Sequence, residues 1–233
     1  MKKIFLITVL IFLLTGCQVD YNLTIDKNLE VIEEVNMTGT NEFFSTYSKT
    51  SKINVIKMLF DDYSKNLLVN NNYNYEFVEP QKKEENPYLL ASKKYNNLKD
   101  YSDNTIFYQQ FFEDIKYSEN GNLIRIETVG FNPNDPENPD RYNIHKLTIK
   151  IKSNYIVTDH NASKVNEDTN TYYYEINEDT EDFALKFEFD KTKEFNPYLK
   201  TYLRIGICVL IIILTWTIIY YYNKRTNKKK KNA

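Results

Sequence analysis

The chain has 233 residues, and its formal net charge of −2 hides two regions of opposite charge. Residues 18–200 hold 21 Lys and Arg against 32 Asp and Glu, whereas the last eleven residues hold six Lys and Arg and no acid. The acidic body argues against nucleic acid as a partner, because phosphate binding needs clustered positive charge.

The first seventeen residues have the features of a bacterial lipoprotein signal. The chain begins Met-Lys-Lys, residues 4–14 are apolar apart from Thr8, and Leu14-Thr15-Gly16-Cys17 matches the lipobox. A basic start, a short apolar stretch and small residues before a cut are typical of a secretory signal. We expect residues 1–16 to be a lipoprotein signal peptide and Cys17 to be lipidated. The alternative is a plain signal peptide with a chance cysteine.

Two early segments predict a hairpin and a helix. Apolar residues alternate with polar ones through 19–25 and continue on one face through 29–37, with a turn candidate at 26–28. In 51–68, apolar residues recur every three or four positions and predict one helix. The apolar residues of this predicted helix are Ile53, Ile56, Phe60, Tyr63 and Leu67. Packing against a sheet is the favoured interpretation of this stripe, and binding of a partner is the alternative.

The rest of the body is rich in strand signals. The predicted strands cover 73–78, 105–117, 123–131, 144–151, 155–157, 171–176 and 183–189. Residues 81–86 and 132–140 have the composition of loops. The predicted fold of residues 17–200 is α+β: an antiparallel β-sheet of about seven or more strands with one substantial helix packed on it.

The C-terminal region predicts a single transmembrane helix. Residues 205–222 carry no charge, and eighteen helical residues span about 27 Å, close to the thickness of a bilayer core. The alternative, a buried core helix, is disfavoured because in a domain of this size such a helix keeps a polar face, whereas this stretch is apolar on every face. We expect a transmembrane helix over 203–222 and a basic cytoplasmic tail over 223–233. The predicted location is the cell membrane, lipid-anchored and single-pass, with the soluble domain on the extracytoplasmic face.

Motifs of catalysis and metal binding are weak. Loop 132–140 supplies the carboxylates of Asp135, Glu137 and Asp140, which suit Ca²⁺, but it lacks the glycine and the distant glutamate of an EF-hand loop. His145 and His160 have no neighbouring nucleophile and no ligand partner at metal-binding spacing. We therefore predict no catalytic residue, no metal site and no cofactor.

Clusters of aromatic residues leave one open question about binding. Neighbouring side chains on a strand point to opposite faces, so adjacent rings cannot all enter one core. Core packing and cover by the helix is one explanation. The other is an apolar crevice at the edge of the helix–sheet interface that contacts a lipid or a partner. The residues predicted to line such a crevice are Phe107, Phe111, Tyr172 and Tyr174.

The late part of the body resembles LppM-type lipoprotein domains. The segments that carry the resemblance are Leu147-Thr148-Ile149-Lys150-Ile151, Val157-Thr158-Asp159-His160-Asn161-Ala162, Thr171-Tyr172-Tyr173-Tyr174-Glu175-Ile176 and Leu185-Lys186-Phe187. That family shares the lipobox, an early strand pair, a helix and a C-terminal membrane span with a basic tail. The resemblance implies binding of an envelope lipid; the family has no established catalytic residues, so the resemblance assigns no site.

The functional expectation follows from the two anchors. We expect a non-enzymatic, membrane-anchored envelope lipoprotein whose extracellular domain binds an envelope lipid or a partner protein, including a membrane protein. The alternatives are an envelope hydrolase with an unrecognised site, in which acids and both histidines would surround one cleft, and a surface adhesin.

Overall fold

The computed structural model describes residues 17–47, 49–60, 62–82, 85–108, 112–131, 144–177, 180 and 183–231. It divides into a folded unit that ends at Phe195 and a C-terminal unit that begins at Asn196. The predicted signal peptide, Phe111, loop 132–140 and the side chain of His145 lie outside the described part.

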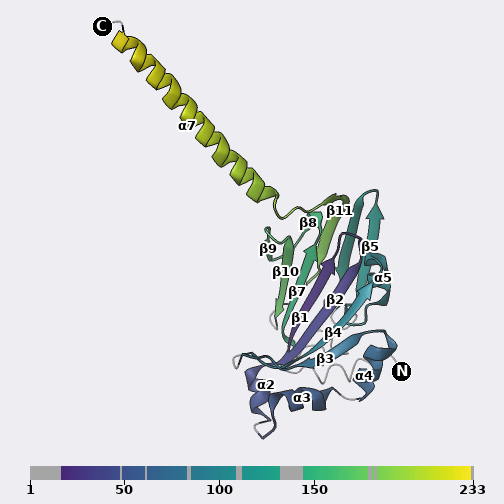
Figure 1. Ribbon diagram of the computed structural model, residues 1–233. Coiled ribbons are helices and arrows are strands. Elements are labelled where there is room, and N and C mark those ends of the chain that lie inside the picture. Colours follow the sequence, from purple (N-terminus) through teal and green to yellow (C-terminus); the bar gives the residue numbers. More distant parts are fainter. Residues whose placement is uncertain are drawn as a thin grey trace. The chain divides into compact units, whose positions relative to one another are not determined.

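The larger sheet of the folded unit has seven strands in the order β3-β4-β2-β1-β7-β10-β9 (Figure 1). Its strands are β1 (Cys17–Ile25), β2 (Val31–Gly39), β3 (Asn74–Val78), β4 (Tyr88–Tyr95), β7 (Ile144–Ser153), β9 (Lys164–Asn166) and β10 (Thr171–Asn177). The expected hairpin of β1 and β2 is present and pairs antiparallel. The sheet is mixed rather than wholly antiparallel, because β7 enters it beside Cys17 and runs parallel to β1.

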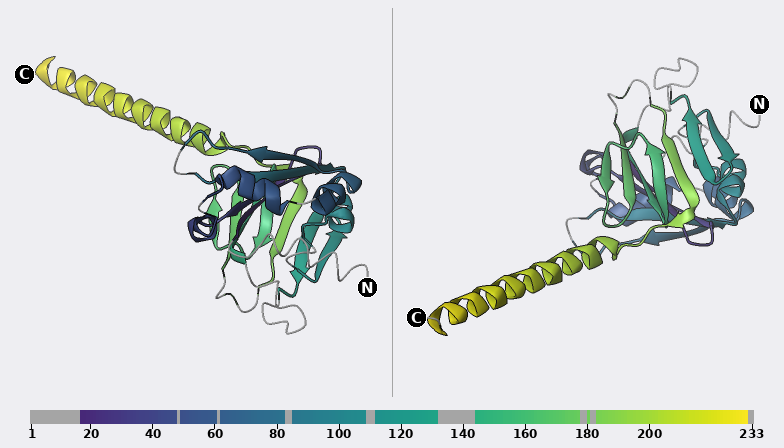
Figure 2. Two further views of the ribbon diagram at one scale, coloured as in Figure 1. Left: turned by 90° about the horizontal axis from the view of Figure 1, so that it is seen from below. Right: turned by 90° about the horizontal axis from the view of Figure 1, so that it is seen from above.

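A second sheet has four strands in the order β5-β6-β11-β8 and packs on one face of the first (Figure 2). Its strands are β5 (Asp114–Asn120), β6 (Leu123–Val129), β8 (Tyr155–His160) and β11 (Lys186–Glu194). Rings from both sheets meet in the core, as in the contact of Tyr172 with Phe187 at 5.4 Å between ring centroids. The α+β class is therefore confirmed, with the strands divided between two sheets.

The helix expected at 51–68 is broken into two. The structure has α3 (Lys52–Leu59) and α4 (Asp62–Asn70) in this region. Phe60 leaves the helical conformation, with φ −88° and ψ 82°, and is 2% exposed. Its ring packs against the rings of Tyr75 and Phe77 at 5.4 and 5.7 Å. Burial of this ring on β3 therefore accompanies the break.

Two short helices were not predicted, and one predicted strand begins late. The helices are α2 (Asn41–Ser45) and α5 (Leu98–Asn104), and each has a side-chain cap, from Thr40 and Asn97. The strand expected from 105 begins only at Asp114. Thr105, Phe107, Tyr108 and Phe112 are buried before it begins, so this aromatic run serves the core rather than a strand.

The core lies between the two sheets and beneath the helices. The inward residues of β1 are Val19, Tyr21, Leu23 and Ile25, all at most 3% exposed. The intervening residues Gln18, Asp20, Asn22 and Thr24 lie on the other face of the seven-stranded sheet, which we call the outer face. The outer face is polar along β1, as expected for a sheet with one solvated side.

The C-terminal unit consists mainly of one helix, α7 (Leu199–Lys231). Residues Tyr202–Tyr220 within it are long and apolar enough to cross a membrane, and none of their side chains is buried. Cys208 lies in this stretch and is a free thiol. The structure thus contains a helix that is a candidate for the single span expected from the sequence.

Candidate functional site: attachment points and a sealed carboxylate

The chain enters the folded unit at one end of β1. Cys17 is the first residue of β1 and pairs with Gly39 of β2 and Ile144 of β7. No flexible linker therefore separates the lipobox cysteine from the sheet. A lipid on Cys17 would hold this end of β1 directly at the membrane surface.

The chain leaves the folded unit at the opposite end of β1. The Phe195 amide donates to the Asn154 carbonyl at 2.7 Å, and the Asn154 amide donates to the Ile25 carbonyl at 2.9 Å. Ile25 is the last residue of β1, so nine strand residues, about 26 Å, separate the two points of attachment. The lipobox cysteine and the segment that leads to the candidate span therefore adjoin opposite ends of one central strand.

The most concentrated chemistry of the folded unit is a buried carboxylate. Glu33 lies on the inner face of β2 between Val31 and Val35 and is 0% exposed. Its two oxygens accept hydrogen bonds from four hydroxyl groups. The donors are Tyr21, Tyr73 at 2.6 Å, Tyr95 at 2.6 Å and Thr105 at 2.8 Å.

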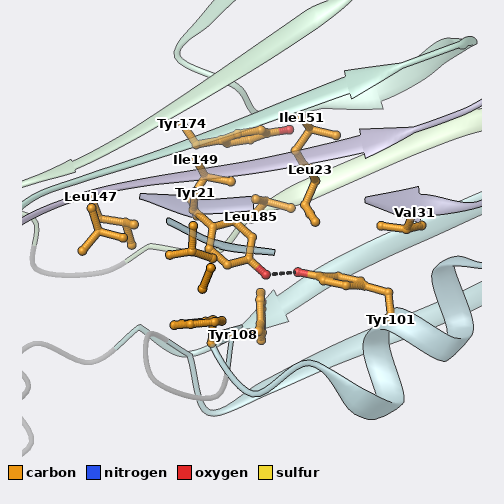
Figure 3. Close-up of a cluster of buried hydrophobic side chains, with 14 of the residues drawn as sticks. Tyr21, Leu23, Val31, Tyr101, Tyr108, Leu147, Ile149, Ile151, Tyr174 and Leu185 are labelled. Carbon is orange, nitrogen blue, oxygen red and sulfur yellow. Dashed lines mark hydrogen bonds between the residues drawn. The ribbon is translucent and has the colours of Figure 1, made fainter. Parts of the chain in front are cut away.

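A second set of contacts extends this cluster, which we call the Glu33 cluster. The Tyr101 hydroxyl lies 2.7 Å from that of Tyr21 (Figure 3), and the Tyr73 hydroxyl lies 2.6 Å from that of Tyr95. Burial, and after it the charge of Glu33, raise the pKa of all four tyrosines well above the usual value. The hydroxyls therefore remain protonated donors at any physiological pH.

Lys93 of β4 packs against the tyrosine rings of the Glu33 cluster. It pairs with Glu33 in the strand register, and its ammonium lies 5.1 and 4.5 Å from the ring centroids of Tyr73 and Tyr95. The same ammonium donates to the Asn104 carbonyl at 3.3 Å. Partial burial lowers the pKa of Lys93, while Glu33 and Asp100 oppose this shift.

The burial of the Glu33 cluster indicates a structural role. Glu33 and the four tyrosines are each at most 4% exposed, so a substrate cannot reach the carboxylate in this conformation. Through one acceptor the cluster links β1, β2 and β4 with Tyr73, which precedes β3, and Thr105, which follows α5. We did not predict it from the sequence. The available signal was an acid on an otherwise apolar face, between Val31 and Val35.

A small cavity lies between the two sheets. Its volume is about 10 Å³, close to the minimum that one water molecule needs. The residues around it are Tyr21, Leu23, Tyr101, Tyr108, Phe112, Ile126, Ile149 and Leu185. Figure 3 shows several of these side chains packed around Tyr21. This cavity has no room for an acyl chain.

The structure separates the aromatic residues expected to line one crevice. Phe107 is 1% exposed and packs edge-on against Tyr73, which immediately precedes β3, at 5.2 Å between ring centroids. Tyr172 and Tyr174 are buried on β10, which is separated from β3 by four strands of the seven-stranded sheet. Their hydroxyls donate to Asn170 Oδ1 at 3.1 Å and to the Lys186 carbonyl at 3.0 Å. In this conformation these three rings pack in the core.

His160, the histidine whose side chain the structure describes, does not belong to a cluster of reactive side chains. His160 is exposed, its ring contacts that of Tyr172 at 4.7 Å, and its Nδ1 accepts from the Ala162 amide at 3.2 Å. Near it, Arg125 pairs with Glu127, Asp159 and Glu188. Within the described residues, no group of three or more His, Cys, Asp or Glu side chains is placed to hold a metal ion.

Comparison with known proteins identifies the attachment signal. The family described as the prokaryotic membrane lipoprotein lipid attachment site matches residues 1–18, which contain the lipobox and Cys17. Comparison with curated proteins gives no match.

Solved structures similar to the chain include the following two. The NMR structure of the folded domain of Mycobacterium tuberculosis LppM has a TM-score of 0.43 and 10% identity, with 75% of this chain and 90% of that chain covered. The structure of native yeast LTA4 hydrolase has a TM-score of 0.28 and 9% identity, with 75% of this chain and 29% of that chain covered. At these identities neither structure transfers any property to the chain. By its attachment signal, the chain is a membrane-anchored lipoprotein.

Proposed function

We propose that the chain is a non-enzymatic envelope lipoprotein that presents its folded domain to a partner protein at the outer surface of the cell membrane. The observation that carries this proposal is the pair of attachment points. In the sequence, a matched lipid attachment site at residues 1–18 precedes the folded unit, and a helix long and apolar enough to cross a membrane, Tyr202–Tyr220, follows it. One span alone would retain the protein in the membrane, so a second anchor that adjoins β1 positions the domain rather than merely retaining it.

The charge at the C-terminus supports the proposed topology. The residues that follow the candidate span include Lys224, Arg225 and the run Lys228 to Lys231. Such a basic flank stays on the cytoplasmic side, while the lipobox belongs to an exported chain. The folded unit then lies on the extracytoplasmic face, on the same side as the lipid.

The packing of the core favours a partner protein over an extracted lipid. An acyl chain needs an open apolar cavity, and the space between the sheets is about 10 Å³. Phe107, Tyr172 and Tyr174 are committed to core contacts. The Glu33 cluster is closed to solvent, and this supports a structural role for its carboxylate.

Site-specific photo-crosslinking in the native host tests this proposal. A photoreactive residue replaces Ser118 on the exposed surface of β5, and in a matched variant it replaces the buried Leu147. We expect a discrete protein adduct from position 118 and none from position 147. Native mass spectrometry of the purified full-length protein provides the second readout. One tightly held lipid per chain, in addition to the lipid on Cys17, would overturn the protein-partner proposal.

A further inference from the structure

The two attachment points limit how the folded unit can stand on a membrane. From Phe195 to Leu199 the chain has four residue steps, and three helical steps follow to Tyr202, the first residue of the candidate span. Together these steps reach about 18 Å. The ends of β1 are about 26 Å apart, so β1 cannot stand upright on a membrane that holds both anchors. Its angle to the membrane plane must stay below about 45°.

The strand beside β1 joins the same two points. β7 begins at Ile144, which pairs with Cys17, and is followed by Asn154, which accepts the hydrogen bond from Phe195. Leu147, Ile149 and Ile151 point into the core and are at most 2% exposed. The alternate side chains therefore lie on the outer face, and three of them are lysines. These are Lys146, Lys150 and Lys152, which we call the β7 lysine row.

The β7 lysine row differs from the cations of the four-stranded sheet in its lack of ion pairs. On the exposed face of the four-stranded sheet, Arg125 is paired with Glu127, Asp159 and Glu188, and Lys186 is paired with Asp159. The lysines of the row have no ion-pair partner among the residues the structure describes. Asp20 and Glu175 pair with Thr148 on the neighbouring strands, two residues along from the levels of Lys146 and Lys150. The row thus offers unpaired positive charge on an acidic domain.

We infer that the folded unit lies on its side, with the outer face of the seven-stranded sheet against the membrane and the β7 lysine row on anionic phospholipid headgroups. This inference rests on the double anchorage proposed above. It adds a second interaction surface, whose partner is the lipid surface itself. Lysines close to an anionic bilayer are attracted to it, and the lipid on Cys17 brings the row within that range. The exposed face of the four-stranded sheet is then directed away from the membrane, where a partner protein can reach it.

Fluorescence quenching on the full-length lipidated protein tests this orientation. The protein, with Cys208→Ser as background, is reconstituted in vesicles of phosphatidylglycerol and phosphatidylcholine that carry a headgroup quencher. One label is placed at Asn22→Cys on the outer face and another at Ser118→Cys on the four-stranded sheet. We expect the Asn22 label to be quenched about threefold or more strongly than the Ser118 label, because contact with the headgroups is short-ranged. Equal quenching, or stronger quenching at Ser118, would overturn the inference.

Two further readouts make the result specific. Lys150→Gln with Lys152→Gln should reduce the quenching at Asn22 by about half in vesicles rich in phosphatidylglycerol. The matched pair Lys99→Gln with Lys116→Gln removes the same charge elsewhere and should leave the quenching unchanged. An equal effect of both pairs would contradict the role of the row. Carbonate extraction and intact mass check the two anchors separately. If both anchors are present and the quenching pattern is reversed, only the orientation fails; if an anchor is missing, the double anchorage itself fails.

Discussion

Glu33 and Lys93 pair directly across β2 and β4, yet the Lys93 ammonium rests on the rings of Tyr73 and Tyr95 while the hydroxyls of these tyrosines bind the carboxylate. The two opposite charges therefore do not form a direct ion pair: Tyr73 and Tyr95 lie between them and contact both. A buried carboxylate that accepts four hydroxyl groups is stable only while all of its partners stay in place.

Removing the carboxylate should weaken the fold. Glu33→Ala leaves four buried hydroxyl groups without their acceptor, and we expect a loss of about 3 kcal/mol or more in the free energy of unfolding. Glu34→Ala removes an exposed acid from the outer face of the same strand and should change the stability by no more than about 0.5 kcal/mol. Chemical unfolding of the full-length protein in detergent, followed by circular dichroism, gives both values. Equal stability of the two variants would contradict the structural role of Glu33.

High pH should unfold the protein through the same cluster. The folded state holds the pKa of Tyr21, Tyr73, Tyr95 and Tyr101 above the unfolded value of about 10. Their contribution is fully present below pH 10 and is lost as the pH rises above it, because only the unfolded state then releases protons. Each tyrosine should lower the stability by about 1.4 kcal/mol per pH unit.

Substitution of one tyrosine tests whether these residues cause the loss of stability above pH 10. Tyr73→Phe removes one titrating group, so the stability of this variant should fall less steeply with pH above 10 than that of the wild type. Unfolding midpoints measured between pH 8 and 11.5 provide the comparison. A slope that is unchanged in the variant would show that Tyr73 does not contribute.

Low pH should destabilise the fold by protonating Asp190, which lies in β11. The Asp190 carboxylate accepts from the Thr192 amide at 3.0 Å and the Thr192 hydroxyl at 2.6 Å, and it pairs with Lys193 at 2.9 Å. These contacts lower the pKa of Asp190 to about 2. The stabilisation is present above the unfolded pKa of about 3.9 and is lost as the pH falls towards 2. Asp190→Asn should therefore flatten the pH dependence of the unfolding midpoint between pH 4 and 2.

The positions of individual β-strands were predictable from the sequence, while the pairing of strands that are distant in the sequence was not. Alternation in 19–37 predicted β1 and β2 because one face of each is buried. Alternation also located β7, but it carries no information on the partner, so the parallel pairing with β1 and the division into two sheets were missed. The break at Phe60 depends on ring contacts with β3, which helical periodicity alone does not contain.

The candidate site was predictable only where its signal is local. The lipobox is four consecutive residues that end at Cys17, and the match to a lipid attachment site confirms it. The Glu33 cluster joins residues that are far apart in the sequence, from Tyr21 to Thr105, and only the fold brings them together. The aromatic run at 171–176 gave no means to distinguish core packing from a crevice, because both place rings on a strand face.

The central claim is that the chain is held in the membrane at both ends of its folded unit, and fractionation after palmitate labelling tests it most directly. We compare the wild type, Cys17→Ser, a chain that ends at Lys200, and a variant that combines both changes. The account predicts that Cys17→Ser loses the label and stays in the membrane, that the shortened chain keeps both label and membrane attachment, and that only the combined variant is released. Release of Cys17→Ser into the medium would contradict the C-terminal anchor, and persistent labelling of that variant would contradict lipidation at Cys17.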